Sequence, residues 1–140
     1  GSKLKIMKEV KIKEHTKRIL VPMDFSEQAI VGLDHAAMLA KELDAEIVML
    51  SVVEESSNLS GIIGKALDMD AATNNILKQQ DELFSQYQKK GIRMEPMVSR
   101  GSVYKEIIRV SEMLAPELLV MSTKWQYYVI IAHLMAQSTT

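Results

Sequence analysis

The chain has 140 residues, with 17 Lys and Arg against 18 Asp and Glu, 47% apolar residues and no cysteine. This length and balance are typical of one compact soluble domain, and the missing cysteines exclude a disulfide scaffold, a thiolate metal site and a cysteine nucleophile. No apolar run approaches the roughly 20 residues of a membrane-spanning helix and no signal peptide is recognisable, so we expect a cytoplasmic protein without a transmembrane segment.

The charge is unevenly distributed along the chain. Residues 1–18 carry seven Lys or Arg against two Glu, whereas the remaining residues carry 10 basic against 16 acidic side chains. We assign residues 1–16 to a basic N-terminal extension, whose Gly1-Ser2 start is typical of a cloning remnant, and residues 17–140 to one domain. The extension reaches an anionic partner or membrane surface, is a solubilising and partly ordered terminus, or packs on its own acidic body.

The first half of the domain predicts two buried strands around a helix. Arg18–Met23 is apolar through its centre and predicts a strand buried on both faces. A helix capped by Asp24 or Ser26 is predicted to follow and to end at Asp44. One face of this helix carries mostly small apolar residues that allow close packing: Ala29, Leu33, Ala36, Ala40 and Leu43. Glu46–Val53 predicts the second strand.

The second half repeats this alternation. Residues 54–68 predict a long connection, and a helix at Ala71–Lys90 ends at Gly91. The pattern from Ile92 to Val98 predicts a strand near the sheet edge, because it contains a proline. A helix from Gly101-Ser102 to Pro116 and a strand at Leu118–Met121 follow. The whole pattern predicts an α/β fold with a doubly wound parallel sheet of about five strands and helices on both faces.

The last segment, residues 125–137, allows two interpretations. Trp125–Ile131 is rich in aromatic and β-branched residues, which favours a last strand after a short connection. A helix is the alternative, because Ile130, His133, Leu134 and Gln137 also fit helical spacing. In either form the apolar segment predicts a homodimer or other oligomer interface. The short end of the domain leaves open that the chain is a module of a tandem or membrane protein.

Ligands of doubly wound folds bind beyond the carboxyl ends of the strands. The chain has neither a GxGxxG fingerprint nor a P-loop there, its three histidines are far apart, and its Gly61–Gly64 GxxG follows a strand instead of joining two helices. No nucleophile, base or metal cluster assembles, so we predict neither an enzyme, nor a metal site, nor nucleic-acid binding. Asp24 is the candidate ligand residue: it can accept hydrogen bonds from an adenine amine or ribose hydroxyls, or cap the helix.

The segment RILVPMDFSEQA at Arg18–Ala29 resembles the opening of universal stress proteins, and the similarity extends over about residues 17–121. The resemblance implies a five-stranded domain, similar to adenine nucleotide α-hydrolases, that commonly dimerises through its last strand. One branch of this family binds ATP and the other acts in stress responses without it. By carry-over, the residues of an adenosine pocket are Pro22, Asp24, Val52 and Met121, with Ser122 and Thr123 as further candidates.

The resemblance ends at the phosphate-binding motif. ATP-binding members place G-x-x-G, nine residues and G-[ST] after the fourth strand, where backbone amides hold the phosphates. Here Ser122 and Trp125 stand at the two glycine positions, and no glycine follows Gly101. The sequence therefore favours a regulatory or interaction domain of the stress response with a degenerate or lost ATP site and no certain cofactor. The alternative is a genuine binder of ATP or another adenine nucleotide that uses Asp24, Val52 and residues 122–124.

Overall fold

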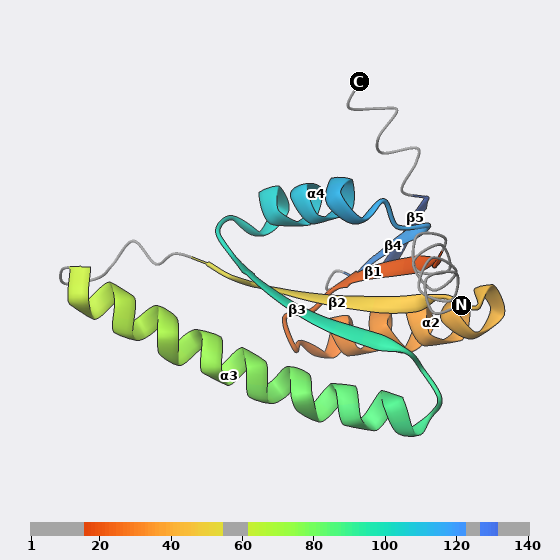
Figure 1. The fold of residues 1–140 in the computed structure, drawn as a ribbon, viewed down its shortest axis with the longest axis horizontal. Helices are drawn as coiled ribbons and strands as arrows, with labels where there is room; N and C mark the ends of the chain where they lie inside the picture. Colours follow the sequence, from red (N-terminus) through yellow and green to blue (C-terminus); the bar gives the residue numbers. More distant parts are fainter. Residues whose placement is uncertain (1–15, 55–61, 123–126, 132–140) are drawn as a thin grey trace, which may run out of the picture.

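The computed structural model describes residues 16–54, 62–122 and 127–131. In chain order the elements are β1 (Arg18–Pro22), α2 (Glu27–Leu43), β2 (Glu46–Val53), α3 (Ile62–Lys89), β3 (Met94–Arg100), α4 (Val103–Leu114), β4 (Leu118–Ser122) and β5 (Tyr127–Ile131). The strands form one sheet in the order β3-β2-β1-β4-β5. Figure 1 shows α2 and α3 on one face of this sheet and α4 on the other. The predicted α/β class is confirmed, and so is the edge position of β3.

The centre of the sheet is apolar on both faces, which is why its strands read as continuous apolar runs. β1 pairs in parallel with β2, and β2 pairs in parallel with β3. Ile19, Val21 and Met49 pack against α2 and α3 in one core cluster. Leu20, Val48 and Leu119 pack with α4 residues Ile107 and Val110 in the other. A strand with helices on both of its faces has no side for polar residues.

The helix ends follow the predicted chemistry. Ser26 is the N-cap of α2, and its side chain accepts a hydrogen bond from the Ala29 amide at 3.2 Å. Asp44 ends the helix in the left-handed conformation with φ 53°. Gly91 follows α3 with φ 82°, a conformation that costs glycine little because it has no Cβ.

The prediction of a connection over residues 54–68 is wrong for its second part. α3 begins at Ile62 and has 28 residues, so Gly64 lies within a helix and not in a loop. A single glycine costs a helix only about 1 kcal/mol relative to alanine. The good helix formers around it outweigh that cost, and the glycine was therefore a poor boundary signal.

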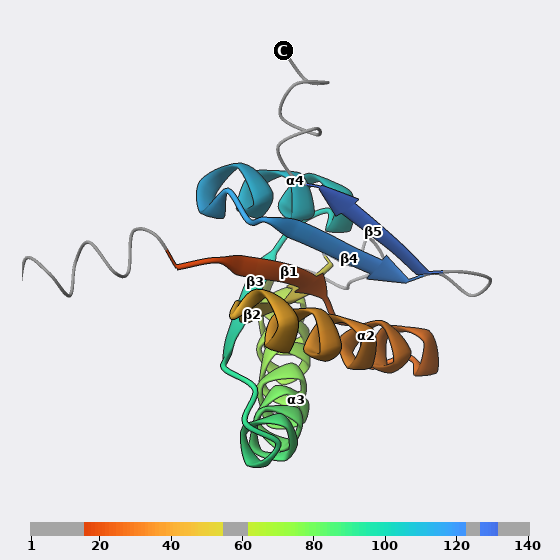
Figure 2. The same cartoon turned by 90° about the vertical axis from the view of Figure 1, so that its right-hand side faces the viewer.

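The prediction of a parallel sheet of about five strands is wrong for the fifth strand, which is antiparallel. β5 pairs antiparallel with β4, with Met121 opposite Tyr128 and Leu119 opposite Ile130 (Figure 2). Only residues 123–126 separate the two strands, whereas a parallel crossover needs about a dozen residues or more. Of the two interpretations of residues 125–137, the strand is confirmed over Tyr127–Ile131; the other residues of that range lie outside the described part.

Two expectations concern parts of the chain that the structure does not describe. The predicted basic extension, residues 1–16, lies outside the described ranges except for Thr16, and so does the whole tail after Ile131. Among the described residues, none of the helices is both long and apolar enough to span a bilayer.

Glu46 of β2 and Glu95 of β3 are carboxylates on neighbouring strands, and the charged form of Glu46 is unfavourable there. Burial, and then repulsion by Glu95 of β3, raise the pKa of Glu46 at the start of β2, against the opposing effect of Arg18 and Arg93. In the folded protein this carboxyl group therefore keeps its proton to a higher pH than in the unfolded chain. The stability that the protonated Glu46 contributes is fully present below the ordinary pKa of 4.5, and it is lost as the pH rises through the raised pKa of the folded protein.

Glu46→Gln should therefore stabilise the protein at pH 7, by less than about 1 kcal/mol because the site is partly exposed to water. The gain should disappear at pH 4, where the native carboxyl group is protonated. Urea unfolding at both pH values measures the difference, and Glu82→Gln on the exposed side of α3 is the control. A gain that persists undiminished at pH 4 would contradict this explanation.

Candidate functional site

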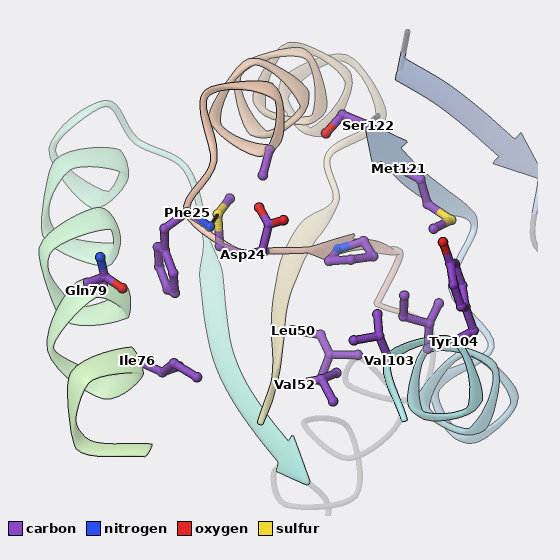
Figure 3. A pocket seen from close by; sticks show the side chains of 14 residues that line it. Asp24, Phe25, Leu50, Val52, Ile76, Gln79, Val103, Tyr104, Met121 and Ser122 are labelled. Carbon is purple, nitrogen blue, oxygen red and sulfur yellow. Dashed lines mark hydrogen bonds between the residues drawn. The ribbon is translucent and has the colours of Figure 1, made fainter. Parts of the chain in front are cut away.

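A pocket of about 380 Å³ opens at the carboxyl ends of the parallel strands (Figure 3), within the size range of small-molecule sites. The ends of β1, β2 and β4, the turn before α2, and parts of α3 and α4 form its walls. The lining residues are Pro22, Met23, Asp24, Phe25, Ala29, Leu50, Val52, Ile76, Gln79, Val103, Tyr104, Ile107, Met121 and Ser122. The pocket thus lies where the topology of an open α/β sheet predicts a ligand site.

Five of the six residues predicted from the sequence line this one pocket: Pro22, Asp24, Val52, Met121 and Ser122. Thr123 lies outside the described residues. The structure thus brings together residues that are separated by up to 100 positions in the chain. Their role in binding a nucleotide stays a prediction.

The sequence reasoning missed four prominent lining residues: Phe25, Ile76, Gln79 and Tyr104. Ile76 and Gln79 come from α3, which reaches the pocket through its position in space and carries no binding motif. Tyr104 is 72% exposed at the rim of the pocket. Tyr104 directly follows Val103, the first residue of the apolar stripe of α4, and an aromatic residue off that stripe at the start of a helix was the available signal for it.

The turn between β1 and α2 holds the only strongly perturbed backbone of the pocket. Phe25 has a positive φ of 66°, which is costly for a residue with a bulky side chain. Its amide donates to the Met23 sulfur at 3.3 Å. The amide and the hydroxyl of Ser26 both donate to one oxygen of Asp24, at 3.0 Å and 2.6 Å. The second Asp24 oxygen makes no hydrogen bond to the described residues, so the side chain both stabilises the turn and presents a carboxylate to the pocket.

A buried polar network fixes this turn from behind. The Ser51 hydroxyl of β2 donates to the Met23 carbonyl at 2.7 Å. The side-chain amide of Gln80 on α3 donates to the Ser51 hydroxyl at 3.1 Å and to the Met97 carbonyl of β3 at 2.9 Å. Ser51 and Gln80 are each only 1% exposed. We name these three residues, Ser51, Gln80 and Met23, the Ser51 network.

Among the lining residues that the structure describes, Asp24 carries the only charge. The remaining polar side chains are those of Gln79, Tyr104 and Ser122. No lysine or arginine of the described chain lines the pocket, so no described cation is placed to neutralise a phosphate. The surroundings of Asp24 suit a hydrogen-bond donor or a cation better than an anion.

Ser122 is directed partly toward α2. A Cβ atom added to Gly32 of α2 would lie 2.8 Å from the Ser122 Oγ and 3.3 Å from its Cβ. The missing side chain at Gly32 is therefore what lets a residue larger than glycine stand at the end of β4. Ser122 occupies the first glycine position of the phosphate-binding motif that the family resemblance led us to expect.

A family model described as the universal stress protein family matches residues 15–127. The chain belongs to the universal stress protein family. A universal stress protein of Methanocaldococcus jannaschii is 26% identical over 113 residues, a match that covers 76% of this chain and 64% of the relative. The chain thus spans less than two thirds of that relative's length. The family resemblance inferred from Arg18–Ala29 is confirmed.

Solved universal stress proteins share the fold. One from Burkholderia pseudomallei has a TM-score of 0.69 at 22% identity and covers 88% of this chain and 89% of its own. A family protein from Arabidopsis thaliana with AMP bound has a TM-score of 0.55 at 13% identity, with 76% of each chain covered. At these identities the likeness establishes the α/β architecture.

In this universal stress protein, the next described element after β4 is the strand β5. Ser122 of β4 lies opposite Tyr127 of β5, so β4 and β5 form an antiparallel hairpin. A helix that starts at the end of a strand presents free amides and the positive end of its dipole to a phosphate. That arrangement is absent at the end of β4 in the described chain.

Ser51→Ala tests the Ser51 network. The variant removes the donor to the buried Met23 carbonyl and one acceptor of Gln80, so it should lower the free energy of unfolding by about 1–3 kcal/mol. Urea unfolding of the variant and of Ser85→Ala, an exposed serine on α3, measures the difference. Equal stabilities of the two variants would show that the network does not hold the turn.

Proposed function

We propose that this chain is a non-catalytic regulatory domain of a stress response whose pocket accepts the nucleoside part of an adenine nucleotide but does not hold the triphosphate. The observation that carries the proposal is the charge of the pocket: Asp24 is the only charged lining residue of the described chain. A triphosphate brings several negative charges, and without cations or directed amides their desolvation is uncompensated. The apolar walls and the single carboxylate instead suit an uncharged ring system with hydroxyl or amine donors.

Family membership and the β4–β5 hairpin support the same reading. The AMP complex of the Arabidopsis relative makes an adenine ligand the natural first candidate. The hairpin removes the helix start that would accept phosphates after β4. We keep the cytoplasm as the proposed compartment, in accord with a sequence that contains no cysteine.

A genuine ATP-binding protein is the second candidate. It is favoured by the convergence of Pro22, Asp24, Val52, Met121 and Ser122 on one pocket, which are the positions carried over from the ATP-binding branch. In that case residues 122–124 would supply phosphate donors by a geometry different from the glycine motif. The two candidates differ in the contribution of the phosphates to affinity.

Calorimetric titration with ATP and with adenosine separates them. Under the proposal, ATP binds no more than a few-fold more tightly than adenosine, because its phosphates find no described partner. ATP that binds more than about tenfold more tightly than adenosine, which is more than 1.4 kcal/mol, would overturn the proposal in favour of the second candidate. Absence of heat with both ligands would contradict the nucleoside site itself.

Asp24→Asn is the matched variant for this titration. The amide keeps an oxygen that can accept from Ser26, so the turn is retained while the negative charge is lost. Adenosine affinity should fall roughly tenfold or more, since a hydrogen bond to a charged group contributes about 1.5–3 kcal/mol. Asp81→Asn on the exposed side of α3 is the control. Unchanged adenosine affinity in Asp24→Asn would remove Asp24 from the site.

We also propose that the domain forms a homodimer through β5. This strand lies at the end of the sheet order and pairs only with β4 among the described strands, and a free strand edge is a template for pairing with another chain. Light scattering should give about twice the chain mass of 15.8 kDa. A monomer mass that persists as the concentration is raised would refute the dimer.

A further inference from the structure

None of the pocket residues carried over from the family resemblance lies on α3. Phe25, Ile76 and Gln79 line the α3 side of the pocket, while Tyr104 and Met121 line the opposite side and Asp24 lies between them (Figure 3). Gln79 is partly buried, and its amide makes no hydrogen bond to any described residue. The other polar side chains among the described lining residues are those of Asp24, Ser122 and Tyr104.

Gln79 is held in place by its neighbour. The buried side chain of Gln80 donates to Ser51 of β2 and Met97 of β3, which fixes both the depth of α3 on the sheet and its rotation about its own axis. Ile76 and Gln79 are three residues apart and therefore lie on the same side of the helix. The anchoring of Gln80 thus presents both of them to the pocket before any ligand arrives.

The same network positions an aromatic ring on the side of the pocket that Gln79 lines. Ser51 binds the Met23 carbonyl at 2.7 Å, two residues before Phe25, and the positive φ of 66° at Phe25 directs the chain into the turn that lines the pocket. An aromatic ring next to an unpaired amide is a combination that proteins use to bind nucleobases, by stacking on the ring and hydrogen bonding to the base edge.

We propose that Gln79 determines the base specificity of the pocket: its amide reads the edge of an adenine ring that lies against Phe25 and Ile76. This inference rests on the proposed nucleoside site. A glutamine amide offers one acceptor and one donor side by side, which matches the N6 amine and the N7 nitrogen of adenine. Guanine presents two acceptors, O6 and N7, along the same edge, so the amide oxygen would face another acceptor.

Binding of adenosine and guanosine to the full chain tests the proposal by calorimetry. The wild-type protein should prefer adenosine by roughly five- to a hundredfold, the range of one bidentate contact to a base. Gln79→Leu should weaken adenosine binding by a similar factor and bring the ratio of the two affinities close to one. Gln79→Glu should weaken adenosine binding without a gain for guanosine, because a carboxylate can accept from the N6 amine but has no donor for N7, and the O6 and N7 atoms of guanine are both acceptors.

Gln86→Leu is the control, since Gln86 is exposed on the same helix away from the pocket. It should leave both affinities unchanged, and thermal unfolding should show that all variants fold. Wild-type binding of adenosine with an unchanged preference in Gln79→Leu would overturn this inference and leave the proposed function intact. A wild-type protein that binds neither nucleoside would overturn both.

Discussion

The pocket depends on a hydroxyl group, that of Ser51, buried among apolar side chains at the centre of the sheet. Ser51 donates to the Met23 carbonyl and accepts from Gln80, so one side chain connects the turn after β1 to the helix that covers β2 and β3. Burying these groups costs free energy, and the Gln80 Oε1 atom has no hydrogen-bond partner in the described structure. An apolar core would avoid that cost. The gain is a fixed geometry: the walls that carry Asp24 and Gln79 keep their relative position through a few short contacts.

The sequence predicted those features whose cause is local. The apolar runs of β1 and β2 reflect burial on both faces, and Asp44 and Gly91 end their helices because they tolerate positive φ. It did not predict the Ser51 network, because nothing distinguishes Gln80 from other glutamines of a polar helix until the helix is placed on the sheet. The start of α3 was missed because glycine is a weak boundary signal. The candidate site was half predicted: motif residues from the strands were found, and the α3 residues were not.

The end of β4 departs from the glycine-rich phosphate-binding pattern, while the pocket beside it keeps its walls. Residues 123–126 are too few for a crossover, so β5 returns antiparallel and the sheet keeps five strands without another helix. Gly32 of α2 meanwhile leaves room for Ser122 where a backbone approach to phosphate would otherwise need glycine. Under the proposed function, both features lie at the end of the pocket where phosphates would be held. The opposite end, with Asp24, Val52 and the α3 residues, is unaffected by them, since it is held from β1, β2 and the Ser51 network.

The length of α3 carries the helix beyond the sheet on which it packs. Its 28 residues extend over about 42 Å at 1.5 Å per residue, whereas the eight residues of β2 extend over about 26 Å. Figure 1 shows the N-terminal part of α3 reaching past the end of the sheet. A helical segment without a sheet beneath it has few buried contacts to resist local opening. Local opening therefore begins most easily at the N-terminal end of α3, whereas Ile76 and Gln79 lie close to Gln80, which is anchored to β2 and β3.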